Sequence, residues 1–271
     1  CEAYHPVIEN LQPSKFINNY QLMSFINLQW LTKHKYPILK SDISSDHEFT
    51  QFLNGYQLDG KQSFVCMDIS ISNISRTDGN RASDFNNHSI NDYYLAMNYL
   101  IKEGNTIILM GNNISSDLSY DNDKILDSSK VIKLSRNISY NVKLNLIAKS
   151  KLFISTIYGQ HHIANGYGVK ICLINVPLNC GIPYYSNALI LPQLMFSISQ
   201  KTILSFENIL EKDLFYAYKE NVLALKGVSL LYNTRKAILE TIIQSLNEKS
   251  IVKIKKISEF NKKFHELNTD N

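Results

Sequence analysis

The chain has little that would indicate a metal, redox, membrane or nucleic-acid-binding protein. It has four cysteines in 271 residues and no C-x-x-C pair, so neither a zinc site nor a redox dithiol is indicated. Cys66 and Cys172 lie within apolar strand patterns and are most simply small core residues. No apolar run approaches the ~18 residues of a membrane span, and no signal peptide is visible. Lys plus Arg exceeds Asp plus Glu only by 28 to 24, which is too weak to argue for nucleic acid.

What is present is the composition of an ordinary globular protein. Hydrophobic residues make up 44% of the chain and charged residues 19%. At 271 residues, it is long enough for one large or two modest domains with a sizeable core. The chain begins with Cys1 instead of Met, which is typical of a processed or truncated piece. A cytoplasmic location is the default expectation.

The stretch Leu152–Asn175 is the centre of the predicted fold. It reads as a buried strand over Leu152–Thr156, a short polar turn, a helix of about three turns, and a second buried strand over Val169–Asn175. Apolar strands separated by helices also precede this stretch. The expected strands are Phe64–Ile71, Thr106–Gly111 and Val131–Leu134, and the expected helices are Ile90–Glu103 and Tyr140–Lys149. This order predicts an α/β, Rossmann-like fold with a mostly parallel sheet and helices on both faces.

Two further sections flank this predicted sheet domain, which we assign to residues 61–248. Residues 1–60 are expected to be a separate, mainly helical section, with helices at Gln21–His34 and His47–Leu58. Residues 249–271 form a basic amphipathic tail. The tail is compatible with a helix packed back on the body or with a helix at a membrane surface.

The chain between Asn175 and the tail is less regular. Leu189–Phe196 is apolar but interrupted by Pro192, which predicts an edge strand or an extended segment. Helices are expected at Ser205–Lys212 and at Asn233–Asn247.

A polar corner lies where the central strand gives way to its helix. Ser155, Thr156, Gly159 and Gln160 fall at the carboxyl end of that strand, which is where ligands bind in open α/β sheets. Unpaired backbone N–H groups and the helix dipole there favour an anion such as a diphosphate. Ser and Thr at such a place also commonly serve only to cap the helix.

The order and spacing of several motifs resemble a family of surface-polysaccharide glycosyltransferases, over about two-thirds of the chain from Ser63 to Leu246. The motifs are Val65-Cys66-Met67-Asp68-Ile69-Ser70, Asp84-Phe85-Asn86-Asn87, Ile90–Gly104, Ile107–Gly111, Leu152–Tyr158, Gly168–Asn175 and Leu204–Leu210. Members of this family look like the C-terminal half of a GT-B fold and are distantly similar to fucosyltransferases that use GDP-fucose. The resemblance implies a nucleotide-sugar donor, a glycan or lipid-linked acceptor, and no cofactor or metal in the chemical step. The similarity to enzymes that use GDP-fucose points to a GDP-linked donor. Residues 1–60 would then be the remnant of an acceptor domain.

The chain departs from the family pattern at the residues that would meet the donor. The first strand of the family reads roughly Val-Cys-x-His-Val-Arg, but this chain has Asp68 for the histidine and Ser70 for the arginine. A second arginine is replaced by Asn86. An arginine fork pairs bidentately with phosphate and offsets the charge on a leaving diphosphate. Either Arg76 or Arg81, on the long polar loop, takes over this role, or the site has lost its main electrophilic help.

The remaining site residues follow from the positions of strand ends and from the resemblance together. Asp68 is a candidate general base for inverting attack by an acceptor hydroxyl, or else a carboxylate that caps a loop. Gly111, Asn112 and Asn113 are candidates for base or ribose contacts. Tyr158 stands for the serine of the family's central turn, and His161 either donates to a phosphate or is a structural histidine.

Two functions therefore remain open. The chain is a glycosyltransferase that moves a hexosyl or deoxyhexosyl unit to a capsule, lipopolysaccharide or related glycan, or it is a degenerate relative that acts as a binding or scaffold module. The enzyme would be cytoplasmic, with the basic tail as a route to peripheral contact at the inner face of the membrane.

Overall fold

The structure is a computed structural model, and it describes residues 47–58, 62–69, 90–110, 127–135, 137–156, 160–176, 188–212, 214 and 220–247. The first 46 residues of the expected N-terminal section and the whole basic tail lie outside these ranges. Of that N-terminal section, the described part contains the predicted second helix, α2, at His47–Gly55.

The main body is a parallel sheet of six strands in the order β3-β2-β1-β4-β5-β6, which confirms the predicted α/β, Rossmann-like fold. The strands are β1 Phe64–Asp68, β2 Thr106–Leu109, β3 Val131–Lys133, β4 Leu152–Ser155, β5 Ile171–Val176 and β6 Ala188–Pro192. The helices between them are η5 Ile90–Tyr93, α3 Tyr94–Lys102, η6 Ser128–Lys130, α4 Tyr140–Lys149 and α5 Gln160–Gly166. Helix α5 has seven residues and is therefore shorter than the three turns expected from the sequence.

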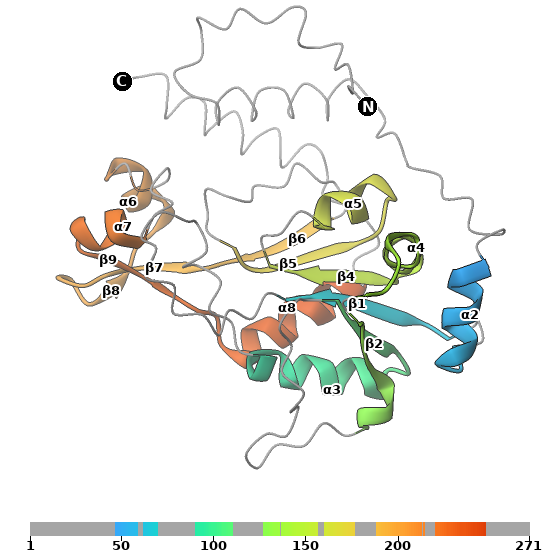
Figure 1. The fold of residues 1–271 in the computed structure, drawn as a ribbon. Coiled ribbons are helices and arrows are strands. Elements are labelled where there is room, and N and C mark those ends of the chain that lie inside the picture. Colours follow the sequence, from blue (N-terminus) through green and yellow to red (C-terminus); the bar gives the residue numbers. More distant parts are fainter. Residues whose placement is uncertain are drawn as a thin grey trace, which may run out of the picture.

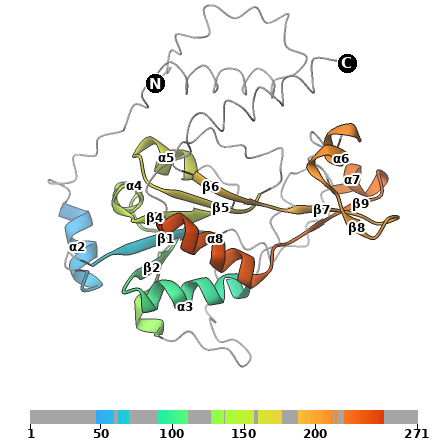
Figure 2. The same cartoon turned by 180° about the vertical axis from the view of Figure 1, so that it is seen from behind.

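Helices cover both faces of the sheet, as Figures 1 and 2 show from opposite sides. Helices α3 and α8, the latter at Arg235–Asn247, pack on one face, and α2, α4 and α5 pack on the other. Side chains therefore alternate along each central strand. On β1, Val65 and Met67 join the core under α3 and α8, whereas Cys66 joins the core under α4. Such two-sided cover explains why every residue of β1, β2, β4 and β5 is buried.

The cysteines in these strands behave as small apolar residues. Cys66 and Cys172 are fully buried and free, as the sequence predicts. Burial raises the pKa of both thiols, so neither is a thiolate near neutral pH.

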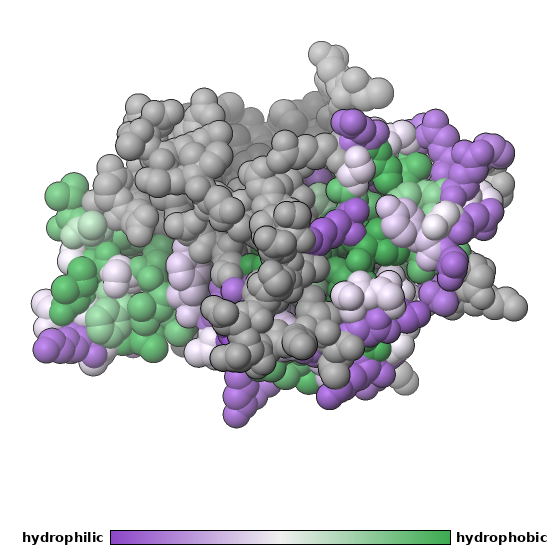
Figure 3. All heavy atoms as spheres, turned by 60° about the horizontal axis from the view of Figure 1, so that its bottom comes forward, coloured by the Kyte–Doolittle hydropathy of each residue, from purple (hydrophilic) through white to green (hydrophobic). Residues whose placement is uncertain are grey.

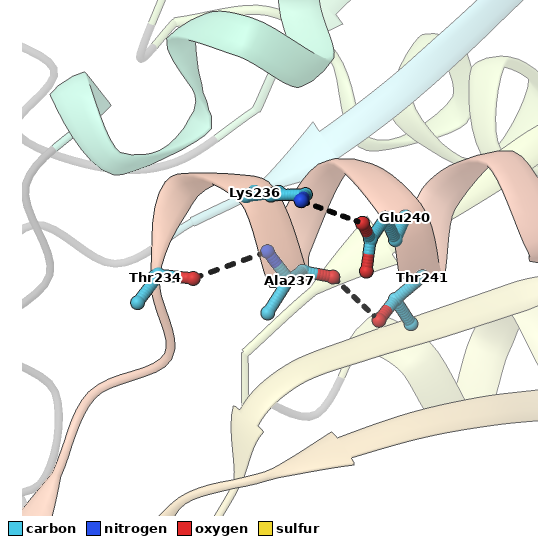
Figure 4. A network of polar contacts seen from close by, with 5 residues as sticks. All are labelled: Thr234, Lys236, Ala237, Glu240 and Thr241. Carbon is cyan, nitrogen blue, oxygen red and sulfur yellow. Dashed lines mark hydrogen bonds and ion pairs between the residues drawn. The ribbon is translucent and has the colours of Figure 1, made fainter.

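Helix α8 packs with α3 over their shared core and is capped by a threonine at its start (Figure 4). The Thr234 hydroxyl accepts a hydrogen bond from the Ala237 N–H at 3.2 Å, and the Thr241 hydroxyl donates to the Ala237 carbonyl at 2.8 Å. Lys236 and Glu240 form an ion pair of 3.9 Å on the exposed side of the helix, where such pairs contribute little to stability. Among the described residues, no helix combines the length and the apolar character needed to cross a membrane.

A second, antiparallel sheet stands beyond the carboxyl end of β6. Its strands are β7 Leu194–Ser197, β8 Thr202–Ile203 and β9 Val228–Leu231, in the order β8-β7-β9. Helices α6 Phe206–Glu211 and α7 Glu220–Leu225 lie against one side of it (Figure 1). The expected single segment Leu189–Phe196 is thus two strands in different sheets, separated by Gln193. The sequence pattern did not reveal β8 or β9.

Candidate functional site

The order of the strands places a topological switch point between β1 and β4. The chain leaves β1 toward α3 on one face of the sheet, and it leaves β4 toward α5 on the opposite face. The carboxyl ends of β1 and β4 are neighbours in the sheet, with Asp68 opposite Ser155. Open α/β sheets bind their ligands outside the carboxyl ends of the two strands that meet in this way.

The backbones of the two strands are joined at this point by side-chain and main-chain bonds. The Ser155 hydroxyl lies 3.1 Å from the Asp68 carbonyl and 2.7 Å from the Thr156 carbonyl, and its single proton is shared between these two acceptors. The Thr156 N–H also donates to the Asp68 carbonyl, at 3.4 Å. The proton of Ser155 is thus engaged within the protein, and what this side chain can offer a ligand is its lone pairs.

Asp68 is the titratable group at the centre of the edge. Its side chain is 6% exposed, and burial raises its pKa from 3.8 to about 6, while the charge of Lys143 acts in the opposite direction. A carboxyl with a pKa near 6 is ionised at neutral pH and is still basic enough to take a proton from a hydroxyl. Asp68 is therefore a buried carboxyl with a raised pKa at the carboxyl end of β1.

Lys143 is a site residue that the sequence analysis missed. Helix α4 leads into β4, so its first turn lies at the carboxyl edge of the sheet, and Ser139 caps it by accepting a 3.3 Å hydrogen bond from the Val142 N–H. Lys143, in the next turn, is partly buried and acts on Asp68 through its charge. The sequence indicates only that Lys143 lies near the start of a helix between two strands, and its effect on Asp68 depends on how that helix packs against the sheet.

Polar atoms on the other side of the switch point are buried and lack partners. Thr156 is fully buried, and neither its hydroxyl oxygen nor the Gln160 Oε1 has a hydrogen-bond partner among the described residues. Buried polar groups in native proteins are nearly always paired, so a water or a ligand group is the usual explanation. His161 is buried, and its ring lies 4.2 Å from that of His162. Burial lowers the pKa of His162, which keeps that ring neutral near pH 7.

The structure thus brings five of the expected site residues to or near the ends of β1 and β4: Asp68, Ser155, Thr156 and, in the first turn of α5, Gln160 and His161. The other expected site residues lie outside the described residues. They are Arg76, Arg81, Gly111, Asn112, Asn113, Tyr158 and Gly159. The described part of the chain has no group of three or more His, Cys, Asp or Glu side chains placed to hold a metal ion.

Comparisons with known proteins give distant structural likenesses only. No protein-family model matches the chain, and no curated protein matches it. Among solved structures, the ADP-heptose lipopolysaccharide heptosyltransferase II of E. coli is similar at a TM-score of 0.45 and 14% identity, over 78% of this chain and 54% of that one. A glycosyl transferase family 9 protein of Veillonella parvula is similar at a TM-score of 0.44 and 11% identity, over 73% and 50%. The chain therefore spans about half the length of these two proteins.

Proposed function

We propose that the chain is a glycosyltransferase domain that moves a sugar from a nucleotide-sugar donor to a surface glycan, without a metal in the chemical step. The observation that carries the proposal is a buried carboxyl with a pKa of about 6, Asp68, at the switch point of a parallel sheet in the nucleotide-binding strand order. The motif order that resembles surface-polysaccharide glycosyltransferases supports the same function. The two structural likenesses are too distant to add to it.

In this proposal, Asp68 takes the proton of an acceptor hydroxyl as its oxygen attacks the anomeric carbon of the donor sugar. The bond from that carbon to the diphosphate breaks, and the nucleoside diphosphate leaves with the electron pair, so the configuration inverts. The charge that grows on the diphosphate requires a cation nearby. Among the described residues, Lys143 is a cation whose charge acts on Asp68. Arg76 or Arg81 would add a further positive charge beside the diphosphate.

The donor and acceptor follow from the resemblance. We expect a hexosyl or deoxyhexosyl donor, with GDP as the first nucleotide to test, and a capsule-type or lipopolysaccharide-type glycan or lipid-linked acceptor. We further propose a cytoplasmic enzyme whose basic tail, residues 249–271, holds it at the inner face of the membrane.

The second candidate function is a degenerate, non-catalytic relative that binds a partner or serves as a scaffold. It is favoured by the replacement of the expected strand arginine by Ser70 and of the second arginine by Asn86. The two functions differ in whether the edge of the sheet binds a diphosphate at all.

A thermal-shift screen separates them. GDP, UDP, CDP and TDP at millimolar concentration are each added to the purified protein, and we expect at least one to raise the Tm by mass action. Lys143→Met should reduce that shift, whereas Lys149→Met, on the exposed side of the same helix, should leave it intact. Replacing Arg76 and Arg81 together by Ala should abolish it. If none of the four nucleotides raises the Tm of the unaltered protein, the transferase proposal fails and the scaffold function takes its place.

Asp68→Asn tests the chemical step separately from binding. The variant should bind the active nucleotide as the unaltered protein does, because its amide keeps the shape of the carboxyl, but it should transfer sugar at least a hundredfold more slowly, since loss of a general base typically removes about 10²–10⁴ in rate. Transfer by Asp68→Asn at the normal rate would remove Asp68 from the mechanism.

A further inference from the structure

The antiparallel sheet has one face that the described helices leave open. We call it the open face, and its apolar residues come from β7 and the turn after it, from β8 and from β9: Leu194, Phe196, Ile198, Ile203 and Leu231. All of these except Phe196 are at least 37% exposed. Figure 3 shows this apolar area at the left of the view. Single exposed apolar side chains are common, whereas a contiguous group of them marks an interaction surface.

The open face offers few groups for hydrogen bonding. Among the residues of the three strands that point to this face, Ser229, opposite Phe196, is the one polar side chain. The backbone of β7, in the middle of the sheet, is paired with β8 on one side and with β9 on the other. Protein partners usually form about one hydrogen bond per 100–200 Å² of interface, whereas lipid chains form none. The chemistry of the open face therefore suits lipid better than it suits a protein surface.

The charged side chains of the strands and turns of this sheet have one sign. Residues 188–205 and 226–234 are described throughout, and they contain two lysines and no Asp or Glu. Lys201 is exposed in the turn between β7 and β8, at one end of the open face. Lys226 lies in the turn before β9, and Arg235 begins α8 soon after that strand. An apolar surface bordered by cations is complementary to a surface that is apolar and anionic.

This charge argues against the two occupants that the chain itself could supply. A second copy packed face to face would bring the same cations together, because a two-fold contact uses the same surface twice. The strands offer no carboxylate to pair with them, and Glu207 and Glu211 lie on α6, on the covered side of the sheet. The basic tail, residues 249–271, has six Lys against three Asp and Glu, so its charge has the same sign as that of the open face.

We propose that the open face docks on a lipid bilayer that contains anionic lipid. Its aliphatic side chains enter the boundary between the headgroups and the acyl chains, and the Lys201 ammonium group meets the lipid phosphates. This contact is separate from the one proposed for the basic tail. It depends neither on nucleotide binding nor on sugar transfer, so it stands or falls independently of the proposed function. A chain with both contacts would be held more tightly than by either alone, because the second contact forms within a complex that the first has already made.

The test is cosedimentation of the full chain with vesicles of phosphatidylcholine, alone or mixed with phosphatidylglycerol. We expect the unaltered protein to bind the mixed vesicles more tightly. Ile203→Asp should weaken that binding by about tenfold or more, because lipid excludes a carboxylate and anionic headgroups repel it. Leu225→Asp is the matched control, since Leu225 is 88% exposed but ends α7, on the covered side, and it should stay within about twofold of the unaltered protein. Lys201→Gln should cost about fivefold on mixed vesicles and nothing on phosphatidylcholine alone.

Ile198→Asp, in the turn after β7, repeats the test without altering a strand, so the test does not depend on the folding of Ile203→Asp. If both open-face variants bind mixed vesicles as Leu225→Asp does, the inference is overturned, and any membrane contact belongs to the basic tail. Absence of vesicle binding by the unaltered protein overturns it as well. Sedimentation equilibrium without vesicles tests the other occupant of the open face. A dimer that Ile203→Asp dissociates would show that a second copy covers this face, and that result also overturns the inference.

Discussion

The two sheets of this protein bury their side chains in different ways. The parallel sheet has helices on both faces, and every residue of β1, β2, β4 and β5 is buried. The antiparallel sheet has α6 and α7 on one face only (Figure 1), and its other face carries Leu194, Ile198, Ile203 and Leu231 at 37–54% exposure. Apolar side chains gather over this part of the molecule, at the left of Figure 3. The comparison shows that a parallel sheet needs cover on both faces, whereas an antiparallel sheet folds with one face open.

The register of the second sheet explains how so many apolar side chains share its open face. Leu194 lies opposite Leu231, and Phe196 lies opposite Ile203. Residues directly opposite one another in an antiparallel pair point to the same side of the sheet. The alternate residues Met195 and Val228 belong to the small core under α6 and α7. The open face therefore carries apolar side chains from all three strands, with Ser229 opposite Phe196 as a polar residue among them.

The largest expected effect comes from truncating equivalent large residues in the two sheets. Phe153 of β4 is fully buried in the core under α4, so Phe153→Ala should lower the free energy of unfolding by about 3–5 kcal/mol. Ile203 of β8 is 54% exposed, so Ile203→Ala should lower it by less than about 1 kcal/mol. Urea unfolding measures both values. Similar losses at the two positions would mean that the open face is covered in solution.

A smaller effect is expected at the carboxyl edge of the parallel sheet, where the buried carboxyl of Asp68 makes the free energy of unfolding depend on pH. The folded protein holds the proton of Asp68 up to about pH 6, whereas the unfolded chain releases it near pH 3.8. Between these values the folded state binds more protons, so the free energy of unfolding falls as the pH rises. The stabilisation is fully present below pH 3.8 and is lost above pH 6. A difference of about two pH units corresponds to about 3 kcal/mol.

Asp68→Asn cannot titrate, so its stability relative to the unaltered protein should rise by about 3 kcal/mol between pH 4 and pH 7 in urea unfolding. Asp127→Asn is the matched control. Asp127 is exposed, and its hydrogen bond from Ser129 lowers its pKa, so this variant should not gain stability as the pH rises. A constant difference between Asp68→Asn and the unaltered protein across this range would show that the carboxyl is not held in its neutral form by burial.

The parallel sheet was predictable from the sequence because its signals are local. Leu152–Ser155 and Ile171–Val176 are short, mainly apolar runs separated by a helix, and such strands are typical of a sheet covered on both faces. The second sheet was not predictable in this way. Strand β8 has two residues, and β9 depends on pairing with β7 across a long stretch of chain, so neither has a pattern of its own.

The candidate site was predictable only in part. Asp68, Ser155 and Thr156 could be placed because they end recognisable strands. Lys143 could not be placed, because it matters through its charge on Asp68, which depends on how α4 packs against the sheet. That property cannot be read from spacing along the chain.

The smallest expected effect compares two serine caps, one in each region. The Ser139 hydroxyl caps α4 and also donates to the Glu48 Oε2 on α2 at 2.6 Å, whereas the Ser205 hydroxyl only caps α6, accepting from the Asn208 N–H at 3.1 Å. Ser205→Ala should lower the free energy of unfolding by about 1 kcal/mol, and Ser139→Ala by somewhat more because it also loses the link to α2. Glu48→Gln keeps an acceptor for that bond, so it should lower the free energy of unfolding by much less than the difference between Ser139→Ala and Ser205→Ala. Urea unfolding of the three variants measures these values. If Ser205→Ala proves the more destabilising, the prediction is wrong, and the small antiparallel region depends on its helix caps more than the large sheet does.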